Sequence, residues 1–457
     1  MNDFRVGVNY MPYITGALSG NAITAQSVGI PDVPTSVLPA FAFTAGNLTG
    51  GTFGNAEVLS EFADTVGQVS DTAILSKGNH TFHMGFQLFR YRIDTYYSGN
   101  AGVAGQFNFN GQYSGAPEAD FMLGMPSEVE GGIAGGTWGQ RSSVISSFVQ
   151  DDWRVTHNLT LNLGLRWELQ TPWIEVENRQ ATFGLVNAVE YLAGASCPYS
   201  NCRALYNQYN GPTNFQPRLG LAWTPRGGKT VIRAAVTTSS FLEGTGTNAR
   251  LPLNPPFATE HDIQYTPSQT PSTLAQGYSV FGSGTNPATE FVGADLRIWD
   301  PQDRPALSNQ WNAAVQRQFG NSLTLQVAYV GQRSTHLMIP VYISQEILNP
   351  NGTVQQTYYL SGNPTLQNEI GYAKSTESAA NQDYHGLQIS VQRRLAQGLE
   401  FQGNYTWSKC MTDSWGFYGQ EGSGGQASPQ GHMQNTYNLA AEWGRAITIR
   451  SRRLAAL

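Results

Sequence analysis

The sequence predicts an all-β fold, an antiparallel up-and-down transmembrane β-barrel of which this chain supplies part of the wall. Five tight turns are each flanked by two runs of roughly ten residues in which apolar and polar side chains alternate, as in strands that cross an outer membrane. Long loops rich in glycine and polar residues separate the hairpins, so we expect short periplasmic turns and long extracellular loops. The turns are Lys77-Gly78-Asn79, Thr156-His157-Asn158, Arg226-Gly227-Gly228-Lys229, Gly320-Asn321-Ser322 and Ala396-Gln397-Gly398.

The composition favours a membrane-embedded β-protein over a soluble one. Only 13% of the 457 residues are charged, whereas 50 are glycine and 11% are aromatic. No stretch approaches the roughly 18–20 consecutive apolar residues of a membrane helix, and a β-barrel is the other fold that satisfies every backbone group in lipid. The net charge of −6, without a cluster of positive residues, argues against a nucleic-acid partner.

The strand after the second turn shows the alternation most clearly. Apolar residues fall on one face and polar or small residues on the other, because successive side chains point to opposite sides of a sheet. The same pattern recurs in residues 81–88, 218–223, 323–329, 387–392 and 399–405. In the clearest strand the apolar residues are Leu159, Leu161, Leu163, Leu165, Trp167 and Leu169, and the others are Thr160, Asn162, Gly164, Arg166, Glu168 and Gln170.

Aromatic residues gather near the predicted strand ends, as in the girdles that flank the apolar band of outer-membrane barrels. A large soluble antiparallel sheet with one wet face is the alternative. We favour the barrel because the strands are close to the roughly 9–11 residues that a tilted membrane strand needs. The candidate girdle consists of Trp153, Trp167, Trp223, Trp311, Tyr329, Tyr405 and Trp407.

The predicted up-and-down strand pattern is incomplete at both ends of the chain. Residues 4–10 and 435–444 each add a predicted strand to the five hairpins, which gives about twelve strands. We divide the chain into a partial barrel, 1–444, and an aberrant basic tail, 445–457, explained first by a frameshift or assembly break and second by a natural basic tail. The N-terminus lacks the basic and apolar segments of a signal peptide. The chain is therefore either cytoplasmic or a truncated fragment, and we favour the fragment.

The second hairpin carries a specific resemblance to a known family. Gln150-Asp151-Asp152-Trp153, followed by the strand from Asn158 and Leu159 through Gly164 and Arg166 to Glu168, resembles a signature of TonB-dependent outer-membrane receptors. Further segments resemble the Oar-like subgroup, and the resemblance covers residues 2 to about 444. These segments are Ala119-Asp120-Phe121-Met122-Leu123-Gly124, Phe215-Gln216-Pro217-Arg218-Leu219-Gly220, Ser308-Asn309-Gln310-Trp311-Asn312, Tyr384-His385-Gly386-Leu387-Gln388 and Tyr405-Thr406-Trp407-Ser408-Lys409.

The resemblance implies an outer-membrane receptor that imports a large substrate, such as an oligosaccharide, a peptide or a siderophore. In the intact protein, surrounded by outer-membrane lipid, the TonB energy-coupling complex would act on a plug. Barrels of this family have about 22 strands, so the chain would supply about half of the wall. The family's N-terminal β-sandwich, plug and closing strand are not found in it, and we expect this chain alone not to transport. A surface adhesion or structural barrel is the alternative, followed by a soluble carbohydrate-active enzyme.

No enzyme signature and no cofactor motif is found. Asp151 and Asp152 would point to opposite faces of a strand, so they cannot share an acid–base site. His80, which we assign to the turn, and His83 would also face opposite sides, and the other histidines are scattered. We therefore expect neither catalysis nor a metal site.

Cys197 and Cys202 lie at a spacing that a small disulfide could close, which would fit an oxidising compartment. Free thiols and, last, a metal site are the alternatives, because two thiols alone cannot complete a zinc site. Cys410 has no assigned role. Substrate-binding residues are unknown, although tyrosine and asparagine in the long loops could hold sugars or peptides. The predicted loops are 92–140, 171–214, 240–306, 332–383 and 409–434.

Overall fold

The computed structural model describes most of the chain. Arg226 of the third predicted turn, Gln397 of the fifth and 415–434 of the last predicted loop lie outside the described residues. Within the described part, no helix combines the length and apolar character needed to cross a membrane. The described residues are 1–16, 23–33, 37–46, 49–56, 59–99, 102–133, 135–205, 213–225, 227–241, 248–281, 291–300, 303–348, 350–352, 354–355, 359–396, 398–414, 435–446 and 452–456.

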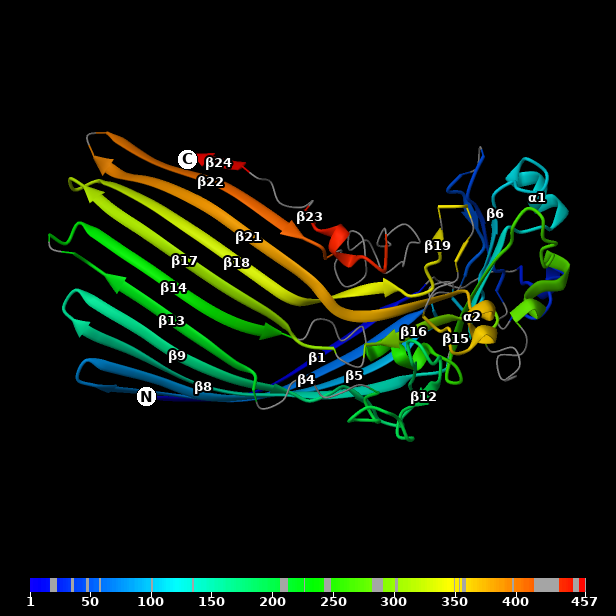
Figure 1. The fold of residues 1–457 in the computed structure, drawn as a ribbon, viewed down its shortest axis with the longest axis horizontal. Helices are drawn as coiled ribbons and strands as arrows, with labels where there is room; N and C mark the ends of the chain where they lie inside the picture. The colour runs from blue at the N-terminus through cyan, green and yellow to red at the C-terminus, as the bar shows by residue number, and fades with distance from the viewer. Residues whose placement is uncertain are drawn as a thin grey trace.

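One large antiparallel sheet forms the wall of the structure (Figure 1). Each strand of its main path pairs antiparallel with the next, so the predicted up-and-down arrangement is confirmed. Among the described residues β1 is at one edge, and β23 and β24 (Arg452–Ala456), which both pair with β22, are at the other; no pairing closes a barrel. The path is β1 (Asn2–Thr15), β4 (Ser60–Lys77), β5 (His80–Tyr97), β8 (Trp138–Thr156), β9 (Leu159–Gln170), β13 (Phe215–Trp223), β14 (Thr230–Phe241), β17 (Ala306–Phe319), β18 (Leu323–Tyr342), β21 (Tyr372–Ala396), β22 (Leu399–Thr412) and β23 (Gly444–Arg445).

The predicted turns join β4 to β5, β8 to β9, β13 to β14, β17 to β18 and β21 to β22, all at one end of the wall (Figure 1). In the first hairpin the turn is shorter than predicted. Gly78 takes a φ of 59°, and Lys77 pairs directly with His80. His80 is therefore the first residue of β5 and not part of the turn, because the glycine reverses the chain within two residues.

Several strands extend far beyond the predicted runs. β5 has 18 residues, β8 has 19, β18 has 20 and β21 has 25, so the predicted loops 92–140 and 332–383 both begin and end inside strands. Consecutive residues of β18, Leu337, Met338 and Ile339, are all buried. Both faces of the strand are covered at this level, and the register with β21 shifts on both sides of Leu337. The alternation that marks a strand in the sequence is therefore lost, although pairing with β21 resumes at Ile339.

The predicted loops fold into a second layer of structure at the end opposite the short turns (Figure 1). We call this part the crown. Its largest sheet has the order β15 (Thr259–Gln264), β7 (Glu128–Ile133), β6 (Gln106–Phe109), β2 (Ala40–Phe43) and β3 (Thr52–Phe53). The remaining elements are β10 (Ile174–Glu175), β11 (Ala181–Phe183), β12 (Glu190–Leu192), β16 (Asp295–Trp299), β19 (Ile347–Leu348), β20 (Val354–Gln355), helices α1 (Pro117–Leu123) and α2 (Pro364–Glu369), and 3-10 helices η1 (Gln26–Val28), η2 (Asn248–Leu253) and η3 (Leu274–Phe281).

The buried core lies in the crown and not in the wall. One cluster packs Phe41, Phe43, Phe107 and Phe109 around Phe121 of α1, with ring centroids 5.4–6.0 Å apart in the closest pairs. A second joins β16, β18 and β21 through buried aliphatic residues. In the turn-proximal half of the wall, by contrast, large apolar side chains are exposed. The crown therefore has the interior of a water-soluble fold, whereas the wall needs another apolar surface to cover it.

The predicted strand 435–444 is wrong. Those residues form a turn and the 3-10 helix η6 (Leu439–Glu442), and only Gly444 begins the short strand β23. Thr436 bonds Gln345 through both its backbone N–H and its hydroxyl, and Tyr437 stacks on Tyr359, so the segment is held against the crown. A further strand, β24 (Arg452–Ala456), pairs with β22. It lies in the basic tail, where no strand is predicted.

Candidate functional site

Strand register gives the wall two chemically different faces. Val149 pairs with Met84 and Leu165, Leu219 pairs with Leu163 and Val236, and Val327 pairs with Val315 and Ile389, so all lie on one side. We call this side the apolar face. Val149, Leu219 and Val236 are 49%, 53% and 52% exposed, which no soluble core position would be. The residues that alternate with them form the opposite side, the polar face.

Arg166 organises the polar face between three strands. Its guanidinium donates to Ser146 Oγ at 2.7 Å, to Glu168 Oε2 at 2.8 Å and to Gln87 Oε1 at 3.4 Å. Gln87 pairs with Ser146 and Ser146 with Glu168, so these residues form a row across β5, β8 and β9. The Arg166 and Glu168 side chains are only 18% and 16% exposed, and their charges are balanced locally.

Asp152 forms a second polar row nearer the turns. Its Oδ1 accepts hydrogen bonds from Asn162 Nδ2 at 2.7 Å and Gln150 Nε2 at 3.0 Å, and its Oδ2 lies 3.4 Å from His83 Nε2. Asp151 points to the apolar face instead, where its Oδ2 lies 2.7 Å from His80 Nδ1. The two adjacent carboxylates therefore do not share a site.

The family-signature residues fall on one hairpin but not in one site. Gln150, Asp152, Arg166 and Glu168 line the polar face. Trp153, on the apolar face, stacks on His80 with centroids 5.3 Å apart, and Asn158, whose Oδ1 accepts from Thr156 Oγ1, occupies the turn. Leu159 pairs with Trp223 across β9 and β13, and Gly164 pairs with Gln150 across β8 and β9.

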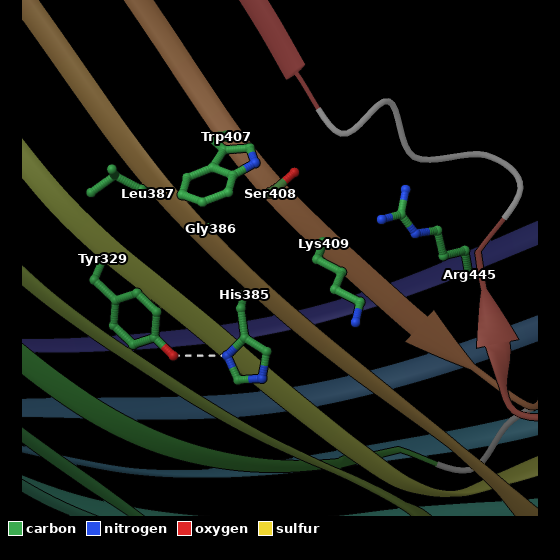
Figure 2. A pocket seen from close by; sticks show the side chains of 8 residues that line it. All are labelled: Tyr329, His385, Gly386, Leu387, Trp407, Ser408, Lys409 and Arg445. Carbon is green, nitrogen blue, oxygen red and sulfur yellow. Dashed lines mark hydrogen bonds between the residues drawn. The ribbon is translucent and has the colours of Figure 1, made fainter.

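The candidate girdle residues all lie on the apolar face, by register, and at different heights. Trp153 and Trp223 are next to the short turns, and Trp167 is farther along the wall. Leu159, which pairs with Trp223, is about 27 Å from Trp167 along β9 at ~3.4 Å per residue. Trp311, Tyr329, Tyr405 and Trp407 lie six to eight residues from the turn-side ends of their strands. Tyr329 and Trp407 line a pocket that opens on this face (Figure 2).

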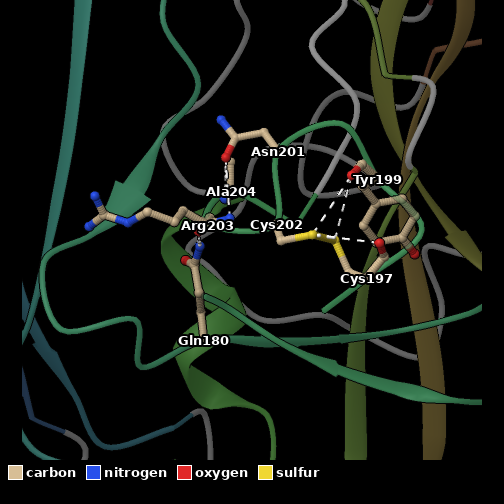
Figure 3. The surroundings of a disulfide bond; sticks show 7 residues. All are labelled: Gln180, Cys197, Tyr199, Asn201, Cys202, Arg203 and Ala204. Carbon is tan, nitrogen blue, oxygen red and sulfur yellow. Dashed lines mark hydrogen bonds between the residues drawn. A yellow bond between two sulfur atoms is a disulfide. The ribbon is translucent and has the colours of Figure 1, made fainter. Parts of the chain in front are cut away.

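A disulfide joins Cys197 and Cys202 in the structure, in a crown loop (Figure 3). The chain is held in place directly after the bond: Gln180 Nε2 donates to the Arg203 carbonyl at 2.9 Å, and Leu205 is fully buried. The third cysteine, Cys410, is a buried free thiol in β22. The part of the chain that the structure describes holds no group of three or more His, Cys, Asp or Glu side chains arranged for a metal ion.

Sequence reasoning misses the buried charges of the crown. Burial and the neighbouring carboxylate of Glu128 raise the pKa of Glu130 to about 7. Burial and the carboxylates of Glu128 and Glu130 raise the pKa of Asp262 to about 8. Arg297 and Glu260 form a buried ion pair nearby. These side chains come from β7, β15 and β16, which are distant in sequence, so no local pattern brings them together.

Several solved structures are similar to this chain at low sequence identity. The copper transporter OprC is 8% identical with a TM-score of 0.43, and the match covers 90% of this chain and 44% of OprC. The ferric-catecholate import receptor Fiu of E. coli K12 is 14% identical with a TM-score of 0.36, covering 90% of this chain and 45% of Fiu. The ferripyoverdine receptor of Pseudomonas aeruginosa is 12% identical with a TM-score of 0.36, covering 89% and 38%.

The chain thus spans less than half the length of each of these structures. No curated protein matches the sequence. A family model described as an outer membrane beta barrel domain matches residues 1–456, nearly the whole chain. With an apolar face, a polar face and a meander of long strands, the chain belongs to the outer membrane β-barrel domain family.

Proposed function

We propose that the chain is part of the wall of a TonB-dependent, Oar-like transporter, in which the polar face lines the path of a large substrate. The row formed by Arg166, Glu168, Gln87 and Ser146 carries this proposal. Charged and amide side chains on the side opposite the lipid suit a water-filled or plugged interior. An adhesin would use its wall only to anchor the crown at the membrane, and it would need no row of charged and amide side chains along the inner face of that wall.

The resemblance of the second hairpin to TonB-dependent receptors supports the same proposal. In the intact protein a plug and the TonB complex would drive import, and the wall would supply the conduit. The imported compound would be an oligosaccharide, a peptide or a siderophore, the classes that this resemblance implies.

The crown favours a second candidate, a surface receptor or adhesin without transport. Its buried aromatic cluster and its disulfide-closed loop keep the loops of the crown ordered, so that they can present a fixed surface to a partner. Binding at the crown is compatible with both candidates, so the two differ in whether cells accumulate the bound compound.

An uptake assay in the bacterium that carries the gene distinguishes a transporter from an adhesin. Accumulation of labelled maltodextrins, casein peptides and a ferric catecholate would be compared in the parent, in a deletion of this gene and in a deletion of tonB. Transport predicts that at least one of the three probes is lost in both deletions. Binding that persists without tonB, with no accumulation in any strain, would support adhesion and contradict the transporter. The flanking genomic sequence is the cheaper companion test, because transport requires a plug in the same reading frame.

A further inference from the structure

We propose that the pocket on the apolar face holds the phosphate headgroup of an anionic membrane lipid. The pocket has a volume of about 780 Å³ and is formed by four strands (Figure 2). Tyr329 comes from β18, His385 and Leu387 from β21, Trp407 and Lys409 from β22, and Arg445 from β23. This inference does not depend on whether the barrel transports anything.

Strand register places the pocket on the side of the wall that meets lipid. Leu387 pairs with both Tyr329 and Trp407, in line with the exposed apolar residues of these strands. Trp407 is 57% and Tyr329 42% exposed. Tyr405 and Phe401 continue the same apolar face toward the short turns. A lipid whose headgroup sits in the pocket could therefore lay its acyl chains along this strip.

The height of the pocket matches the boundary of the membrane. Trp407 lies eight residues along β22 from Leu399 at the short turn, about 27 Å at ~3.4 Å per residue, and Tyr329 lies six residues along β18 from Leu323, about 20 Å. Aromatic rings at this level mark the headgroup region of the bilayer. The pocket thus opens where phosphate groups, and not hydrocarbon, are the neighbouring lipid atoms.

The positive charges of the pocket favour the binding of an anion. Lys409 pairs with His385, and Arg445 pairs with Met411, so the two cations lie two residues apart on one face. Neither Lys409 nor Arg445 forms an ion pair with an acidic side chain of the described residues, and the acidic residue next along this face, Asp383, pairs with Arg333 at 3.8 Å. Unpaired cations beside a lipid surface are costly unless an anion joins them, and phosphate is the anion that the surface supplies.

The histidine adds a directed contact. Tyr329 Oη lies 2.7 Å from His385 Nδ1, and the two rings stack with centroids 6.2 Å apart. This bond fixes the imidazole and leaves Nε2 to face another group. Lysine, arginine and an oriented histidine nitrogen together give donors for several phosphate oxygens, while Trp407 and Leu387 contact the apolar part of the lipid.

Native mass spectrometry of the whole chain in detergent tests the proposal. Dioleoyl phosphatidylglycerol and dioleoyl phosphatidylcholine would be titrated separately, and bound lipid counted for the wild type, K409Q, R445Q and the double variant. Each lost cation should weaken phosphatidylglycerol binding about fivefold, and both together roughly 30-fold, with little change for phosphatidylcholine. R317Q is the matched control, because Arg317 is also on the apolar face but stacks on Phe319 next to a short turn.

The outcomes separate the possible ligands. K409R should retain binding, which shows that charge and not a loss of folding explains the K409Q result. Equal phosphatidylglycerol binding by the wild type and the double variant would overturn the proposal. So would displacement of the lipid by millimolar inorganic phosphate, which would indicate a site for a free anion, and so would equal affinity for the two lipids.

Discussion

Asp151 and Asp152 are adjacent in the chain, yet their carboxylates bond different histidines on opposite faces of the wall. Asp151 meets His80 at 2.7 Å on the apolar face, close to the turn, and Asp152 meets His83 at 3.4 Å on the polar face. The Asp151–His80 pair lies near the strand end, where the cost of a charge near lipid is small. Two adjacent residues of one strand thus carry their carboxylates to opposite faces of the wall.

The Arg166 row should stabilise the wall measurably. Arg166→Met leaves the Glu168 carboxylate, 16% exposed, without its cation and removes the link to Gln87. We expect a loss of about 2 kcal/mol in the free energy of unfolding, measured by urea titration in detergent micelles. Arg218→Met, an exposed arginine of the same face, is the control and should change stability little. An equal effect of both substitutions would mean that the row has no special role.

The crown should lose stability as the pH rises. Glu130 and Asp262 have folded-state pKa values of about 7 and about 8, above their ordinary values, because burial and mutual repulsion oppose ionisation. A raised carboxyl pKa contributes stability that is fully present below the unfolded pKa, near 4, and is lost as the pH rises through the folded values. Hydrogen exchange of β6, β7 and β15, corrected for intrinsic rates, should therefore be faster at pH 8.5 than at pH 5.

Two substitutions isolate this effect. Glu130→Gln and Asp262→Asn together remove the groups that must ionise, so the corrected exchange should become nearly independent of pH. His80→Gln, far away at the turns, should leave the pH dependence unchanged. Protection that increases with pH in the wild type would show that the assigned direction is wrong.

The bonding of the three cysteines can be tested on denatured protein, by counting the thiols that react. With Cys197 and Cys202 bonded and Cys410 free, the oxidised protein, denatured without reductant, should accept one alkyl group, and the reduced protein should accept three. Mass spectrometry after alkylation counts the groups. Opening the bond should expose the loop around Tyr199 to protease and cost about 2 kcal/mol of local stability, because the closed loop is short. Three alkyl groups without reductant, in protein from an oxidising compartment, would contradict the bond.

The hairpins of the wall are predictable from sequence because they are local. Each turn lies between strands that pair with each other, and the alternation of Leu159 through Leu169 already separates the faces. The crown is not predictable in this way. Phe41 pairs in parallel with Phe107, and Asp262 pairs with Glu130 across more than a hundred residues, so no window of sequence contains both partners.

The residues of the candidate site are likewise only partly predictable from the sequence. Arg166, Glu168 and Asp152 are visible in the sequence as polar positions of alternating strands. Their partners Gln87, Ser146 and His83 require the register between strands, which the pattern does not give. The incorrect strand at 435–444 has the same origin: contacts with Gln345 and Tyr359, far away in the chain, hold Thr436 and Tyr437 in a turn.

The two-faced wall is the central claim, and cysteine labelling in lipid vesicles tests it most directly. Ala235→Cys and Val236→Cys, neighbours on β14, would be compared in a Cys410→Ser background with a water-soluble, membrane-impermeant maleimide. We predict that the cysteine at 235, on the polar face, reacts readily, and that the cysteine at 236, on the apolar face, reacts only after detergent is added. Equal reactivity in intact vesicles, or faster reaction at 236, would contradict a wall with one face in lipid and the other in water.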